Sequence, residues 1–175
     1  MRKIVIVAIC GLLAGTAYAK VKPVAHYNFG KSGNVSFAVA PESVNSSKGD
    51  NPLGALGRPL FYADAPSDKA AKGQGCILFN GETDGYRINK SLGVATDNMV
   101  LEVWAKARKA DQHKAVVVAN GTEKSGYAIG QRNKQWVLVV NGAVMAVIGD
   151  IVKGRWTHLA VVLDQDKGSV WMARK

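Results

Sequence analysis

Two side chains of this 175-residue sequence, Glu102 and His158, could do acid–base chemistry, and both lie close to tryptophans. His158 follows Trp156 by two positions and could act as a general base. No nucleophile or partner acid stands at motif spacing from it, which favours a buried histidine with a satisfied ring. Glu102 could be half of a glycosidase pair, but Trp104 and Lys106 occupy the positions where a second acid would stand. We therefore assign no catalytic residue and expect no enzyme activity.

An oxygen-rich cluster lies in a loop flanked by glycines, at Asn80, Glu82 and Asp84. Carboxylate and carbonyl oxygens at alternate positions suit Ca²⁺, which accepts six to eight oxygen ligands in a flexible shell. The cluster is therefore a candidate calcium site, and a solvated β-turn is the alternative explanation. No other cofactor is indicated.

Aromatic side chains could provide a surface for sugar rings, whose C–H faces pack against indole. The four tryptophans are Trp104, Trp136, Trp156 and Trp171. Each could equally be a core residue, and Trp156 is expected to be one. Trp136 follows a polar hairpin and is expected to be exposed. With Tyr127 and Arg132 it forms the candidate ligand-binding group.

The elements that must position these residues are predicted to be short strands. The segment 99–107 alternates, with Leu101, Val103 and Ala105 on one face and polar or aromatic residues on the other. Two turn sequences, 132–135 and Asn141-Gly142, predict hairpins, because Asn and Gly tolerate φ > 0. The predicted strands are 24–29, 35–39, 59–62, 76–80, 86–88, 99–107, 115–119, 127–131, 136–140, 143–148, 156–163 and 169–172.

No segment shows sustained helical periodicity, so the sequence predicts an all-β fold, an antiparallel β-sandwich. The N-terminus is treated separately, because residues 1–19 have the features of a secretory signal peptide. Arg2 and Lys3 form a basic start, an apolar run follows, and Ala17-Tyr18-Ala19 is a cleavage site of small residues. The apolar run is too short to span a bilayer. We expect an exported protein, cleaved near Ala19 and without a transmembrane segment, whose domain covers residues 20–175.

The chain is basic, with a net charge of +10 that falls to +8 when cleavage removes Arg2 and Lys3. This charge serves solubility or attracts acidic polymers such as uronic-acid glycans. The basic residues are scattered and match no nucleic-acid-binding motif, so nucleic acid is not an expected partner. Cleavage also leaves Cys76 as the single cysteine, which is predicted to be a buried apolar residue without a disulfide.

Four segments in order resemble a known family. They are Leu78-Phe79-Asn80-Gly81, residues 101–106 (LEVWAK), residues 126–130 (GYAIG) and residues 154–164 (GRWTHLAVVLD). An acidic residue two before a Trp, a Gly-Tyr strand and a Trp-x-His strand occur in this order in the laminin-G-like jelly rolls of the concanavalin A-like lectin/glucanase superfamily. The resemblance implies a jelly-roll sandwich. Family members continue beyond the strand matching 169–172, so either the chain is truncated or a fragment of a longer protein, with C-terminal strands missing, or the resemblance misplaces the end.

The resemblance implies a non-catalytic binding module for carbohydrate or glycoprotein, exported and accessory to a larger secreted glycan-degrading protein. Two alternatives stay open. One is a protein-interaction or adhesion module, with another protein as partner. The other is a fragment of a glycoside hydrolase, such as a sialidase or glucanase, whose catalytic part lies beyond residue 175.

Overall fold

The computed structural model describes residues 27, 37–40, 43–45, 51–66, 75–88, 98–111, 114–122, 124–164 and 169–174. Within these ranges all regular structure is β-strand, and every pairing is antiparallel. The predicted signal peptide and nearly all of the predicted opening strand 24–29 lie outside the described residues. The all-β prediction is confirmed.

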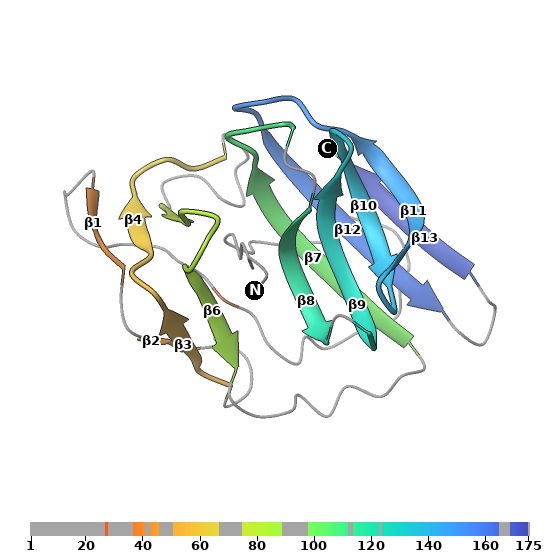
Figure 1. The fold of residues 1–175 in the computed structure, drawn as a ribbon, viewed down its shortest axis with the longest axis horizontal. Coiled ribbons are helices and arrows are strands. Elements are labelled where there is room, and N and C mark those ends of the chain that lie inside the picture. The colour runs from red at the N-terminus through yellow and green to blue at the C-terminus, as the bar shows by residue number, and fades with distance from the viewer. Residues whose placement is uncertain are drawn as a thin grey trace, which may run out of the picture.

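The C-terminal part is a two-layer sandwich. One layer is a four-stranded meander in the order β11-β10-β9-β8, and the other has the order β13-β12-β7. Figure 1 shows the meander in front of the three-stranded sheet. The bounds are β7 Asn98–Lys106, β8 Ala115–Gly121, β9 Gly126–Arg132, β10 Gln135–Val140, β11 Ala143–Asp150, β12 Trp156–Asp164 and β13 Ser169–Arg174.

The larger core lies between these two layers, where alternate side chains of each sheet point inward. Val103 of β7 and Leu159 of β12 are register partners and are both fully buried. Ile129 of β9 and Leu138 of β10 oppose each other in the facing sheet and are also fully buried. Two sheets that each present one apolar face can bury those faces against one another, which is why this part forms a sandwich.

The N-terminal part consists of two small sheets, of order β1-β4-β5 and β2-β3-β6. They lie to one side of the sandwich in Figure 1. Their bounds are β1 Phe37–Val39, β2 Ser43–Val44, β3 Leu53–Leu56, β4 Leu60–Tyr62, β5 Cys76–Leu78 and β6 Gly85–Ile88. A second core cluster belongs to this part and is rich in aromatic rings: Tyr27, Ala40, Leu53, Phe61, Ile77, Phe79 and Tyr86.

Both predicted hairpins are confirmed. Arg132 pairs with Gln135, and the two residues between them, Asn133 and Lys134, have φ of 48° and 64°. Asn141 and Gly142, with φ of 49° and 82°, connect β10 to β11. Two central residues with positive φ give a connection whose twist matches the right-handed twist of the flanking strands.

Candidate functional site

The outer face of β7 and β12 gathers the polar and aromatic residues of these strands. Glu102, Trp104 and Lys106 alternate with the core residues of β7, so they point away from the sandwich interior. On β12, His158 is the register partner of Trp104, and Trp156 is the register partner of Lys106. Antiparallel pairing therefore places five polar or aromatic side chains on one face of the sheet.

Glu102 and His158 form a close pair. His158 Nε2 lies 2.7 Å from Glu102 Oε1, and both side chains are about one-fifth exposed. An ionised carboxylate only accepts hydrogen bonds, so Nε2 is the donor. The imidazole also stacks on Trp104, with ring centroids 4.8 Å apart and planes inclined by 29°. His158 is thus held by a carboxylate at its edge and by an indole on its face.

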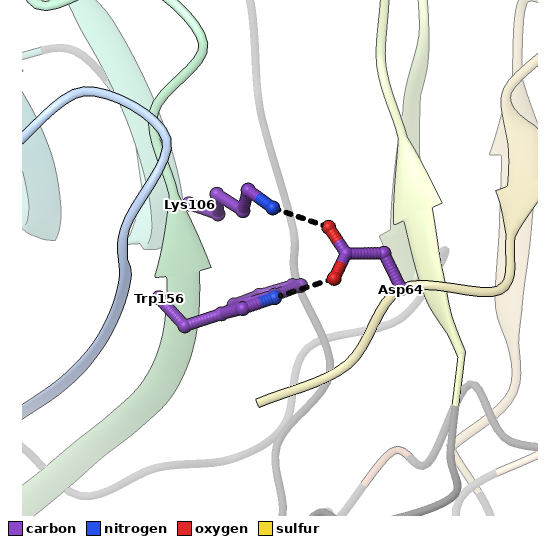
Figure 2. A network of polar contacts seen from close by, with 3 residues as sticks. All are labelled: Asp64, Lys106 and Trp156. Carbon is purple, nitrogen blue, oxygen red and sulfur yellow. Dashed lines mark hydrogen bonds and ion pairs between the residues drawn. The ribbon is translucent and has the colours of Figure 1, made fainter. Parts of the chain in front are cut away.

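A second polar contact joins this face to the N-terminal part. Asp64, which follows β4, accepts a hydrogen bond from Trp156 Nε1 at 3.1 Å and pairs with Lys106 Nζ at 2.5 Å. Figure 2 shows both contacts converging on the single carboxylate. Lys106 Nζ also lies 5.8 Å from the centroid of the Trp156 ring, within range of a cation–π interaction. The Lys106 and Asp64 side chains keep 30% and 27% of their surface exposed.

These contacts define the candidate site: Asp64, Glu102, Trp104, Lys106, Trp156 and His158. Trp104 is 7% exposed and stacks on His158, so the rings that a ligand can reach are the partly buried Trp156 and His158. Groups that donate or accept hydrogen bonds border these two rings, an arrangement that suits recognition of a polar ligand with apolar faces. Each carboxylate already has a partner in the protein: Glu102 has His158, and Asp64 has Lys106 and Trp156.

The structure shows a structural use for two of the three predicted calcium ligands. The two carboxylate oxygens of buried Asp84 accept N–H bonds from Arg58 at 2.9 Å and Asn80 at 3.0 Å. Asn80 Oδ1 accepts backbone N–H bonds from the three residues 82–84, at 2.7 to 3.1 Å. Gly57, at φ 68°, lies so close to Asp84 that a Cβ there would be 2.5 Å from Oδ1. This geometry matches the alternative of a β-turn closed by its own side chains.

Calcium binding at Asn80, Glu82 and Asp84 stays a prediction. No group of three or more His, Cys, Asp or Glu side chains among the described residues could hold a metal ion. A calcium ion would have to compete with the backbone N–H groups for the oxygens of Asn80 and Asp84.

The expected exposure of Trp136 is wrong, and the expected core position of Trp156 is confirmed only in part. Trp136 is 2% exposed and belongs to the core between the sheets, and its indole Nε1 has no hydrogen-bond partner. Trp156, expected in the core, is partly buried: it packs against the core cluster and donates its indole N–H to Asp64. The polar hairpin before Trp136 determines where β10 begins but not which face its first aromatic residue occupies.

The three residues of the predicted ligand-binding group do not form one site. Tyr127 and Trp136 face the core: Trp136 belongs to the core cluster, and Tyr127 packs against it. Arg132 is five positions from Tyr127 on the same strand, so it points to the opposite face at the other end of β9. Binding by Tyr127 or Arg132 individually stays a prediction.

Cys76 is buried, as predicted, and has no disulfide partner. Burial, and secondarily the nearby Asp64 carboxylate, raises the pKa of its thiol to about 11. At neutral pH the residue is therefore a protonated thiol of low nucleophilicity.

Comparison with protein families matches residues 80–172, more than half of the sequence, to the laminin-G-type family of the concanavalin A-like lectin/glucanases superfamily. The matched segment contains Glu102, Trp104, Lys106, Trp156 and His158. Comparisons with curated proteins and with solved structures found no match. Among the described residues, no helix has the length and apolar character needed to cross a membrane.

Proposed function

The chain belongs to the concanavalin A-like lectin/glucanase superfamily, which supports a carbohydrate- or protein-binding role, and we propose that it is an exported, non-catalytic module for carbohydrate or glycoprotein. The observation that carries this proposal is the outer face of β7 and β12. There the Trp104–His158 stack and the Trp156 ring lie on adjacent strands, bordered by Glu102 and Lys106.

A sugar offers an apolar C–H face and a rim of hydroxyl groups, and both fit this surface. The indole of Trp156 supplies a half-buried apolar ring, while Lys106 and Glu102 supply a donor and an acceptor. The net charge, +10 for the full sequence and +8 after the predicted cleavage removes Arg2 and Lys3, favours acidic glycans over neutral ones.

A non-catalytic role is proposed because hydrolysis of a glycoside needs two carboxyl groups flanking the scissile bond, one of them an acid with a free proton to give. In this structure Glu102 is bound by His158, and Asp64 is bound by Lys106 and Trp156. The contacts of Glu102 with His158 and of Asp64 with Lys106 and Trp156 position the aromatic rings. Positioned rings serve the binding of a ligand.

The direct test is a glycan array probed with the purified protein, followed by affinity electrophoresis through hyaluronan, an acidic glycan, and dextran, a neutral one. We expect retardation in hyaluronan that weakens as salt rises. Trp156→Phe and Lys106→Gln should each weaken retardation several-fold, whereas Val147→Ala, on the other sheet, should not. Failure to bind any glycan, or equal binding by Trp156→Phe and the unaltered chain, contradicts the proposal.

Calcium is a subsidiary proposal for the Asn80–Asp84 turn and is tested by repeating the array with EDTA. If calcium takes part, EDTA abolishes binding, and Glu82→Gln weakens it even when calcium is supplied.

A second candidate, a protein-interaction module, is favoured by a different observation. The apolar side chains of β11 are exposed on the other sheet, away from the candidate glycan surface.

A further inference from the structure

Strand β11 is an edge of the sandwich with unusually apolar exposed side chains. It pairs with β10 on one side and is the last strand of the four-stranded sheet, as Figure 1 shows. Val144, Met145 and Val147 are 45%, 58% and 48% exposed. Val144 and Val147 pair with Val139 and Val137, so they lie on the face opposite to Leu138 and the core. Among the described residues no strand pairs with the other edge of β11, which therefore offers both backbone groups and apolar side chains.

This edge lacks the usual protection against pairing with another strand. Proteins protect edges with charged side chains, especially lysine, or with proline. The segment 143–149 contains neither a charged residue nor a proline. Register shifts occur at two places in its pairing with β10, between Trp136 and Val137 and between Leu138 and Val139. Such bulges bend a strand and strengthen its twist, but here they leave the apolar side chains exposed.

The charges around β11 indicate what kind of partner fits. Lys153 and Arg155 are exposed in the connection that follows the strand. Exposed Lys134 is adjacent, because its carbonyl oxygen accepts the backbone N–H of Ile151 at 2.8 Å. One carboxylate, Asp150, lies at the same end and accepts a hydrogen bond from Gln135 Nε2. Three cations against one anion leave this end of β11 positive.

We propose that β11 is a docking edge for an extended, acidic segment of another protein, which adds to the sheet as an antiparallel strand. Backbone hydrogen bonds supply the affinity, alternate apolar side chains of the segment cover Val144 and Val147, and its acidic residues meet Lys134 and Lys153. The acidic residues stand at the N-terminal end of the segment, because an antiparallel partner begins beside the end of β11. A second copy of this chain fits less well, since it would bring the same cations to the contact.

This docking edge is separate from the proposed glycan surface and does not depend on it. The glycan surface lies on the outer face of β7 and β12, and β11 belongs to the facing sheet. Loss of one binding activity therefore leaves the other intact.

The test uses fluorescent peptides of about seven residues, the length of one strand. One peptide has two glutamates followed by alternating valine and threonine, and a matched peptide has two lysines in place of the glutamates. Fluorescence anisotropy with the full purified chain should show at least tenfold tighter binding of the glutamate peptide. A version of the glutamate peptide N-methylated at every residue cannot donate a backbone hydrogen bond from either edge and should not bind.

Charge reversal in the protein sharpens the result. The double variant Lys134→Glu with Lys153→Glu should reverse the preference, so that the lysine peptide binds more tightly. Both side chains are exposed, so circular dichroism should be unchanged. The matched control is Val100→Thr, an exposed apolar position on β7, which should bind like the unaltered chain, whereas Val147→Thr should bind more weakly.

Three outcomes overturn the proposal: no binding of the glutamate peptide, an unchanged preference after charge reversal, or undiminished binding of the N-methylated peptide. Sedimentation velocity tests the alternative partner, a second copy of this chain. A dimer that Val147→Thr dissociates would show that β11 pairs with a second copy, and would also overturn the proposal.

Discussion

The two core clusters of the molecule are built by different means. In the C-terminal sandwich, β7 and β12 are nine residues long and pair along their whole length, and four consecutive strands form the facing sheet. In the N-terminal part the strands have two to four residues. Long ladders satisfy most backbone groups of the sandwich, whereas short strands leave many groups to be satisfied by other means.

Side chains take over that task in the N-terminal part. Asp84 and Asn80 accept backbone N–H groups around one turn, and the Tyr27 hydroxyl donates to the carbonyl of Asn51 at 2.6 Å. The comparison teaches that the sandwich depends mainly on apolar burial, while the N-terminal part depends also on individual polar side chains. It follows that the two parts respond differently to pH and to substitution.

The largest expected difference is in alkaline solution. Burial raises the pKa of Tyr86 to about 12 and that of Cys76 to about 11, and it also raises the pKa of Tyr27. Each of these groups has a lower pKa in the unfolded chain than in the native state. Between its unfolded and its native pKa the native state binds more protons, so the free energy of unfolding falls as pH rises. We expect amide protection of β5 and β6 to disappear between about pH 9 and 12.

Hydrogen exchange with mass spectrometry measures this region by region. Peptides from β9 and β10 should stay protected over the same pH range. Simultaneous loss of protection in both parts would show that they unfold as one unit.

Truncation of a sandwich core residue should give the largest effect of a single substitution. Leu138 is fully buried between the sheets, and Leu138→Ala should lower the free energy of unfolding by about 3 kcal/mol, through lost burial and a residual cavity. Val144→Ala, at an exposed position of the neighbouring strand, should cost less than about 0.5 kcal/mol. Urea denaturation followed by tryptophan fluorescence measures both. Similar costs for the two variants would contradict the assignment of the core.

Loss of one carboxylate oxygen in the N-terminal turn should cost somewhat less. Asp84→Asn leaves a single acceptor oxygen for the two N–H groups of Arg58 and Asn80, so we expect a loss of about 2 kcal/mol. Asp111→Asn makes the same change at an exposed position and serves as the control. Thermal denaturation followed by near-ultraviolet circular dichroism reports the tyrosines of this part. A neutral Asp84→Asn would mean that the oxygens are not needed by the backbone.

The smallest effect is expected where the two parts meet. Asp64→Asn weakens the contact with Lys106 and keeps the side-chain oxygen that Trp156 can bind. Because Asp64 and Lys106 are each more than one-quarter exposed, solvent screens their pairing, and we expect a coupling of at most about 1 kcal/mol. A double-mutant cycle with Lys106→Met measures this coupling. A much larger value would mean that the Asp64 contact holds the N-terminal part in place.

Local signals in the sequence were sufficient for the strands and hairpins of the sandwich. The alternation of β7 and the turns before β10 and β11 need only neighbouring residues to be recognised. Strands β2 and β3 were missed, because they lie in a stretch rich in Gly, Ser, Asn and Pro that resembles loop.

The candidate site was less predictable, because it depends on contacts between distant segments. Glu102 and His158 are 56 positions apart, and Asp64 and Trp156 are 92 apart. Glu102, Trp156 and His158 were considered individually from the sequence, but Asp64 was missed, and no spacing rule relates β7 to β12. The side of β10 on which Trp136 points was ambiguous for a different reason: Val137 and Leu138 are both buried, so alternation did not distinguish the faces.

The pairing of β7 with β12 also has a consequence for how the chain folds. The meander β8-β9-β10-β11 pairs segments that are neighbours in the sequence. In contrast, β7 pairs with a strand that begins 50 positions after its own last residue. Local pairings form early because they close short loops at low entropic cost. We therefore expect the meander to act as a folding template, with docking of β12 onto β7 as the late step that assembles the proposed glycan surface.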